Sequence, residues 1–287
     1  MRTARVLRAA GQVTLFSLVA VSSALAQMPQ INWVKGPSTV DLGDQAQIQI
    51  GQPYTFADAH GAQKLMEVMG NTVSRDEVGL IMPQAKDQDW FMLFEYQPVG
   101  YVKDDDKNEI DKDAILEGIR RGTEEANEVR KSKGIPALHV QGWFEEPHYD
   151  PTTHNLVWAL TARNDDGSEV VNYNVRLLGR QGYMSVTLVD DPAKLAVSKP
   201  EVERLLAGFS YKTGRSYAEF VPGDKVAEYG LVALVAGGAG AAAVKLGLFG
   251  ALFKILAKGG KAVVLLLVAA LAAVKKVLSS MFGRGGE

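Results

Sequence analysis

The chain of 287 residues carries 31 basic and 33 acidic side chains, a formal net charge of -2, and it contains no cysteine. A chain this close to neutral has no excess of positive charge to attract a phosphate backbone, which argues against a nucleic-acid-binding protein. The lack of cysteine excludes disulfides, thiol catalysis and thiolate metal sites, so a hydrophobic core must stabilise the fold.

The first 26 residues have the pattern of a secretory signal peptide. Three arginines within the first eight residues precede an apolar stretch at residues 13–25, and Ala24-Leu25-Ala26 fits a cleavage site. The apolar stretch is shorter than the roughly 20 residues of a membrane-spanning helix, so we expect cleavage rather than retention as an anchor. The mature chain is then predicted to begin at Gln27.

Residues 27–224 are predicted to form one exported domain. Apolar periodicity and turn residues give these elements in chain order: two strands within residues 39–50, a helix at 55–69, strands at 78–82 and 90–96, a helix at 112–133, strands at 138–144, 155–163, 169–178 and 183–189, and a last helix around Val202 and Leu205. The last four strands form a β-meander, with its clearest hairpin turn at residues 164–167. The expected fold class is α+β with an antiparallel sheet.

An acidic run beginning at Asp104 precedes the helix at 112–133. Asp104, Asp106 and Asn108 match the first three alternating ligands of an EF-hand calcium loop. Glu109, however, stands where the loop needs glycine, and Ile115 stands where it needs a bidentate glutamate. The run is therefore interpreted as a solvated loop.

His148, Asp150 and His154 are the best candidates for chemistry in the chain. They lie in a segment, residues 143–154, that is interpreted as a proline-containing turn between two strands. Imidazole and carboxylate groups suit zinc or iron, but this spacing is not an established metal signature. No hydrolase motif and no phosphate-binding glycine loop occurs in the sequence. We therefore predict no catalytic residue and no cofactor, and keep the three side chains as an alternative metal set.

Residues 225–287 are predicted to be a C-terminal membrane anchor with a basic tail. Residues 231–253 are long enough to cross about 30 Å of hydrocarbon, provided that Lys245 faces a partner helix or the headgroups. Asp224 and Lys225 are expected to cap this helix. A second apolar block at 262–274 is compatible with spanning, re-entering or lying in the interface.

Small residues line one face of the first predicted span. Ala239, Ala243, Gly247 and Ala251 recur at steps of four residues. Such a face lets membrane helices pack closely, so the bilayer and a second copy of the chain are expected partners. Lysines after this span satisfy the positive-inside rule, which leaves the main domain outside the cytoplasm.

Several sequence segments along the chain resemble those of an uncharacterised family of membrane-anchored bacterial envelope proteins. They are Trp33-Val34-Lys35-Gly36-Pro37, Gly100-Tyr101-Val102-Lys103-Asp104-Asp105, Gly142-Trp143 with Pro147-His148-Tyr149-Asp150, and Gly223-Asp224-Lys225-Val226-Ala227-Glu228-Tyr229-Gly230. The resemblance implies a bacterial inner-membrane protein whose main domain faces the periplasm. It supplies no catalytic residue.

Two functions remain open from the sequence. The first is a non-enzymatic envelope module that binds another protein, a peptide or a lipid. The second is a membrane-tethered, metal-dependent enzyme that uses His148, Asp150 and His154. The missing catalytic motifs favour the first.

Overall fold

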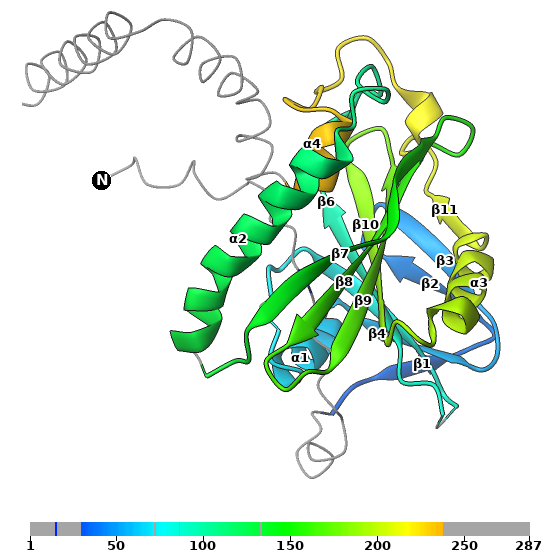
Figure 1. The fold of residues 1–287 in the computed structure, drawn as a ribbon. Coiled ribbons are helices and arrows are strands. Elements are labelled where there is room, and N and C mark those ends of the chain that lie inside the picture. The colour runs from blue at the N-terminus through cyan, green and yellow to red at the C-terminus, as the bar shows by residue number, and fades with distance from the viewer. Residues whose placement is uncertain (1–14, 16–29, 72, 86, 133, 238–287) are drawn as a thin grey trace, which may run out of the picture. The chain divides into compact units, whose positions relative to one another are not determined.

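Two antiparallel sheets dominate the fold, which is known from a computed structural model that describes residues 15, 30–71, 73–85, 87–132 and 134–237 (Figure 1). The larger sheet has eight strands in the order β1-β4-β5-β6-β10-β9-β8-β7, and the smaller has three in the order β11-β3-β2. The strands are β1 (Trp33–Lys35), β2 (Ser38–Leu42), β3 (Ala46–Ile50), β4 (Tyr54–Asp58), β5 (Glu77–Pro83), β6 (Phe91–Gln97), β7 (Leu138–Asp150), β8 (Asn155–Asn164), β9 (Glu169–Leu178), β10 (Tyr183–Asp190) and β11 (Phe209–Tyr211). The α+β fold with an antiparallel sheet is thus confirmed.

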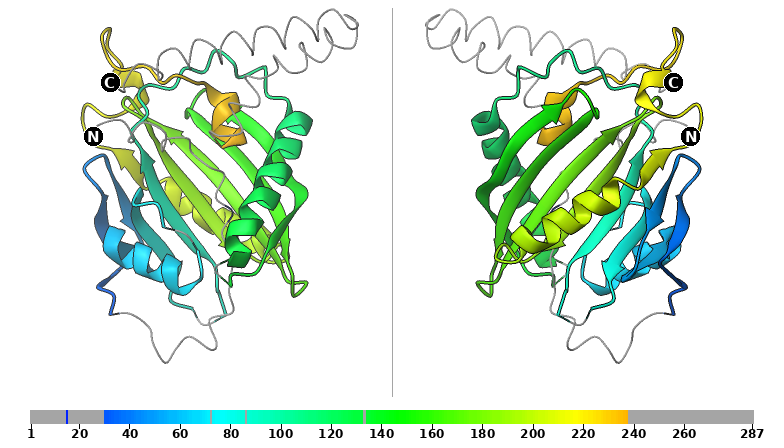
Figure 2. Two further views of the ribbon diagram at one scale, coloured as in Figure 1. Left: turned by 90° about the vertical axis from the view of Figure 1, so that its left-hand side faces the viewer. Right: turned by 90° about the vertical axis from the view of Figure 1, so that its right-hand side faces the viewer.

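Helices cover both faces of the larger sheet. They are α1 (Ala59–Val68), α2 (Lys112–Ser132), α3 (Leu195–Leu206), the short 3-10 helix η3 (Tyr217–Glu219) and α4 (Leu231–Ala236). One face packs with α3 and the smaller sheet around a continuous apolar cluster that includes Ile48, Phe94, Val186 and Val202. On the other face α1 lies along β4 and β5 and α2 along β7, with α4 beside α2 (Figure 2). The central strands are therefore buried on both sides.

Most predicted elements form at the predicted places, and the strand at 90–96 is confirmed as a central strand, because β6 lies between β5 and β10. The predicted helix at 55–69 is wrong in its first turn, which is strand β4. Tyr54, Thr55 and Phe56 are aromatic or β-branched residues that pair with β5. The helix starts only after Asp58, whose carboxylate accepts a hydrogen bond of 2.9 Å from the Gly61 amide.

The segment interpreted as a turn at residues 143–154 is also corrected in part. Strand β7 continues through Pro147 to Asp150, and only the residues after Asp150 form the turn into β8. The pairing of β7 with β8 is irregular between Glu145 and His148. Because β7 is an edge strand with a bulge there, the missing amide hydrogen of Pro147 does not interrupt a central ladder.

The described part of the predicted first membrane span belongs to the folded domain. Residues 231–236 form α4, whose side chains are mostly buried, and Gly237 ends the helix in a left-handed conformation with φ of 72°. Among the described helices, none combines the length and the apolar character that crossing a bilayer requires. Ala239, Ala243, Gly247, Ala251 and the block at 262–274 lie outside the described residues.

The signal-peptide prediction also falls almost entirely outside the described residues. Leu15 is the exception, and it is buried, with 6% of its surface exposed.

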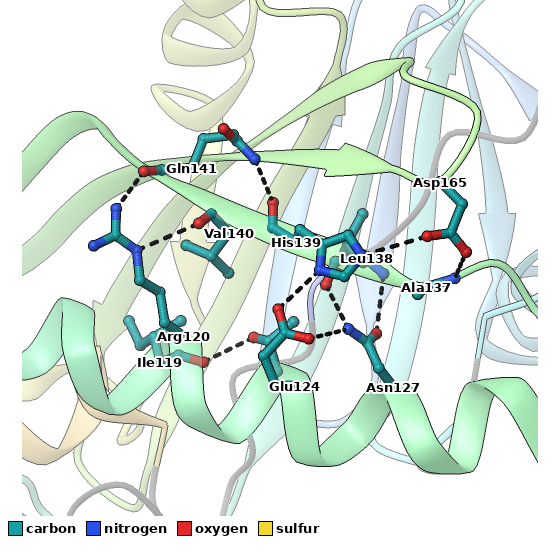
Figure 3. A network of polar contacts seen from close by, with 11 residues as sticks. Ile119, Arg120, Glu124, Asn127, Ala137, Leu138, His139, Val140, Gln141 and Asp165 are labelled. Atoms are coloured by element: carbon teal, nitrogen blue, oxygen red, sulfur yellow. Dashed lines mark hydrogen bonds and ion pairs between the residues drawn. The ribbon is translucent and has the colours of Figure 1, made fainter.

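Helix α2 covers the edge strand β7 with side-chain hydrogen bonds (Figure 3). The buried amide of Asn127 donates to the Leu138 carbonyl at 3.0 Å and accepts from the Leu138 amide at 2.9 Å. Two turns of helix before Asn127, Arg120 donates to the carbonyls of Val140 and Gln141. These side chains occupy backbone groups that an unpaired strand edge would otherwise offer to another chain.

A second contact of α2 with the same strand is charged. Nδ1 of His139 lies 2.9 Å from Oε1 of Glu124 on α2, and Nε2 lies 3.3 Å from Oδ1 of Asp165 in the β8–β9 turn. The hydrogen bond with Glu124 raises the pKa of His139, and the same bond lowers the pKa of Glu124. The imidazolium thus joins three elements, although all three side chains remain exposed to screening by solvent.

We predict that Asn127→Ala lowers the free energy of unfolding by about 2–4 kcal/mol, because it leaves the amide and carbonyl of buried Leu138 without their partner. Urea unfolding of the mature protein measures the change. Glu125→Ala, at an exposed position on the same helix, is the matched control, with an expected change within about 0.5 kcal/mol. Equal effects of the two substitutions would contradict the role of Asn127.

Candidate functional site

His148, Asp150 and His154 are close in sequence, but in the structure each of the three side chains has a different partner. Nδ1 of the exposed His148 lies 3.3 Å from the Glu146 carbonyl oxygen. The Asp150 carboxylate accepts hydrogen bonds of 2.8 Å from the Thr152 amide and from the Thr153 hydroxyl. These two bonds lower the pKa of Asp150 and fold the turn after β7.

His154 has a structural position in the same turn. It adopts a left-handed backbone conformation with φ of 55°, and its Nδ1 lies 2.9 Å from the Tyr149 hydroxyl. Its ring lies 4.3 Å from that of Tyr217, which stacks in turn on Tyr101 at 4.4 Å. Within the described ranges, no three His, Asp or Glu side chains are arranged to hold a metal ion.

A group of polar side chains on the central strands is the stronger candidate site. We call it the sheet-face patch, and it consists of Glu95 on β6, Ser185 and Thr187 on β10, Asn174 and Arg176 on β9, and Trp158 on β8. The strand register brings them together, because Ser185 pairs with both Glu95 and Arg176, while Asn174 pairs with both Thr187 and Trp158. Directly paired residues of neighbouring strands point to the same face.

Alternation along the strands shows which face this is. Phe94, Val175 and Val186 are sequence neighbours of patch residues and belong to the apolar cluster under α3 and the smaller sheet. The patch therefore points to the opposite face, since successive side chains of a strand point to opposite sides. In the left view of Figure 2, this is the face flanked by α1 and α2.

Hydrogen bonds join the patch residues in pairs. The Ser185 hydroxyl donates to Oε2 of Glu95 at 3.4 Å, and the Thr187 hydroxyl donates to Oδ1 of Asn174 at 3.3 Å. The Asn174 side-chain amide also donates to the Asn172 carbonyl at 2.9 Å. The side chains of Thr187 and Asn174 thus satisfy one another with a hydrogen bond.

Arg176 and Trp158 are less completely paired. The guanidinium carbon of Arg176 lies 4.7 Å from the centre of the Trp158 ring, a cation–π contact. Among the described residues, the hydrogen bond that Arg176 donates is a long one of 3.4 Å, to the Val175 carbonyl. In the described part of the chain Arg176 forms no salt bridge, and the fully buried Trp158 has no hydrogen-bond acceptor for its Nε1–H.

Burial governs the ionisation of the two charged members. It raises the pKa of Glu95 to about 7, and nearby Glu77 and Asp76 add to the rise, while Arg176 opposes it. Burial also lowers the pKa of Arg176. An acid that is half-protonated near neutrality, across one strand from a guanidinium that forms no salt bridge with the described residues, is the type of charge arrangement that marks functional sites more often than ordinary surfaces.

The sequence predicts the four strands that carry this patch, but it does not predict that their polar side chains form a patch. In β9, the polar residues Asn172, Asn174 and Arg176 alternate with Tyr173 and Val175. Such alternation ordinarily indicates that one side of a strand faces solvent. Here that side is desolvated as well, and the signal for this was the high apolar content of β6, which lies on the other side of β10.

We predict a pH-dependent effect of Glu95→Gln. Folding raises the pKa of Glu95 from 4.5 to about 7, so the favourable contribution of this group is complete below pH 4.5 and is lost as the pH rises through 7. The native protein should therefore lose roughly 3 kcal/mol of stability relative to Glu95→Gln between pH 4 and pH 8. Urea unfolding at several pH values measures this difference.

Glu117→Gln, at an exposed position on α2, is the matched control and should show almost no pH-dependent difference. A constant difference between the native protein and Glu95→Gln across this pH range would show that Glu95 is not desolvated.

Comparison with known proteins gives a family but no activity. Among solved structures, the fold is similar to PsbP (CyanoP) from Synechocystis sp. PCC 6803, with 12% sequence identity, a TM-score of 0.37, and coverage of 63% of this chain and 92% of that one. No curated protein matches the sequence. Residues 34–272 match the model of a family described as a protein of unknown function, DUF2167. Because this match spans more than half of the chain, the protein belongs to the DUF2167 family.

Proposed function

We propose that this protein is a non-enzymatic binding module of the bacterial envelope, anchored in the inner membrane by its C-terminal region with the folded domain in the periplasm. The leader-like N-terminus and the apolar C-terminal segments support this proposal. The structural observation that carries it is the way in which the residues leading to the predicted anchor are built into the domain.

This connection begins at Asp224, which was expected to cap the anchor helix. That expectation is wrong, because the Asp224 carboxylate instead accepts hydrogen bonds of 2.7 and 2.9 Å from the Arg180 guanidinium. These bonds lower the pKa of Asp224. Beyond it, the backbone amide of Tyr101 donates a hydrogen bond to the Lys225 carbonyl, and the Tyr101 carbonyl accepts one from the Ala227 amide, both at 2.8 Å. The chain therefore continues past residue 224 in contact with the domain.

Asp106 caps α4, the helix at which the predicted anchor begins. Its carboxylate accepts hydrogen bonds from the amides of Leu231 at 2.9 Å and Val232 at 3.1 Å. A side chain at Gly230 would collide with this carboxylate, since a Cβ atom there would lie 2.5 Å from its oxygens. The acidic run interpreted as a solvated loop thus contains a helix cap, which satisfies amides that α4 cannot pair internally.

Such a connection suits a tethered binding module. Residues 224–236 are held by side-chain and backbone bonds, so an anchor that follows Gly237 would leave few free residues between the domain and the bilayer. The metal-dependent alternative has no comparable support, because Asp150 and His154 have structural partners in the β7–β8 turn.

Reporter fusions test the location. Alkaline phosphatase, which is active only outside the cytoplasm, should be active when fused after Gly237, and this fusion should be released from membranes. Fused after Glu287, the reporter should be membrane-bound, and its activity would distinguish one span from two. An inactive fusion at Gly237, or a full-length protein that is not in the membrane fraction, would refute the proposal.

We also predict that Asp106→Ala loosens α4. Loss of the cap should cost about 1 kcal/mol and speed hydrogen exchange of the Leu231 and Val232 amides by roughly fivefold. Exchange measured by mass spectrometry on peptides covering α4 checks this. Asp105→Ala, at an exposed neighbouring position, should leave the exchange unchanged. Similar exchange in the two variants would mean that Asp106 does not hold α4.

A further inference from the structure

We propose that the sheet-face patch binds the carboxylate group of a small ligand, with the Arg176 guanidinium and the Trp158 Nε1–H as donors. The carboxylate belongs either to a free organic acid or to the C-terminus of a short peptide. This inference rests on the proposed function and deepens it, because it assigns the binding activity to a place and names the chemistry of the ligand.

The first argument is the charge of Arg176. A guanidinium has five N–H donors in a planar fork and keeps its proton in proteins. In the described part of the chain, this one has neither a salt bridge nor a short hydrogen bond. The contact with the Trp158 ring occupies part of the guanidinium, and the N–H groups that it does not use can donate to a bidentate acceptor, the geometry that a carboxylate matches.

The second argument is the indole of Trp158. Its side chain is fully buried, yet Nε1 has no acceptor among the residues that the structure describes. A buried donor without a partner costs stability, so it calls for an explanation. An acceptor at the adjacent Arg176 would pair this donor, provided that the side chains covering Nε1 move apart to admit it.

Glu95 is the only carboxylate in the described patch, and its position also bears on the proposed site. Glu95 and Arg176 are separated by strand β10, so their backbones lie roughly 10 Å apart at ordinary strand spacing. Arg176 contacts the Trp158 ring on β8, and its charge also lowers the pKa of Glu95 across β10. Because the pKa of Glu95 is about 7, this side chain is protonated in part at neutral pH and leaves the Arg176 charge available for a ligand.

Access is consistent with a site. Glu95 and Arg176 are partly exposed, whereas Trp158 and Asn174 beside them are buried. On this face α1 packs on β4 and β5, and α2 packs on β7. The left view of Figure 2 shows α1 and α2 on either side of the central strands, with α4 at the upper end of the space between them. The charged pair is thus strongly desolvated but keeps some accessible surface.

Nitrogen-15 NMR of the four tryptophan indoles tests the proposal on the mature full-length protein in detergent micelles. The probes are succinate, the dipeptide Ala-Ala and Ala-Ala amide, at constant ionic strength. Succinate or Ala-Ala should shift the Trp158 indole signal in a saturable way, and the amide should not. Saturation by succinate alone indicates a free acid, and by Ala-Ala a peptide terminus. No saturable shift with either, or an equal shift with the amide, overturns the proposal.

Variants separate binding from folding. Arg176→Gln should weaken binding about tenfold or more, as loss of a charge-assisted hydrogen bond does. Trp158→Phe keeps the ring but removes the donor, and calorimetry should show weaker binding of the same probe by roughly fivefold. Trp90→Phe is its matched control, because Trp90 is also buried with an unpaired Nε1–H but lies in the apolar cluster. If Arg176→Gln does not fold, the two tryptophan variants decide, and equal binding by both overturns the proposal.

Failure of this site is distinguishable from failure of the proposed function. Without binding, but with reporter fusions that behave as expected, only the carboxylate site falls. If the NMR spectra show that a bound probe is converted to a new compound, the site stands and the non-enzymatic function falls.

Discussion

The burial of the central strands on both faces is the constraint on which the rest of this structure depends. Antiparallel sheets commonly leave one face to water, with polar side chains on that side. Here α3 and the smaller sheet cover one face, and the other face lies on the side of α1, α2 and α4. Polar residues on β9 and β10 are therefore desolvated, and each needs a partner within the protein or from outside.

The protein meets this requirement unevenly. Thr187 and Asn174 bond to each other, and Asn127 supplies both bonds to the edge residue Leu138. Arg176 and Trp158 are the exceptions in the described patch. Gln45 and Trp90 also carry unpaired buried polar atoms, but Trp158 is the one in the patch that lies against a cation, and this is where we propose that an external acceptor binds.

The sequence was sufficient for the elements and the fold class, because strand alternation, helix periodicity and the hairpin turn at residues 164–167 are local signals. It was insufficient where a long-range contact decides. Nothing near Asp106 indicates that it caps α4, more than a hundred residues later. Likewise, Glu95 and Arg176 become neighbours only through their pairing with β10, and Tyr54 becomes strand because β5 lies beside it.

Leu15 lies in the predicted signal peptide, so its burial gives the predicted cleavage a consequence for folding. It lies upstream of the predicted cleavage site after Ala26, yet only 6% of it is exposed. Cleavage there would remove a buried leucine, whose transfer from water contributes roughly 1.5–3 kcal/mol when burial is complete. The precursor and the mature chain would then be two proteins of different stability.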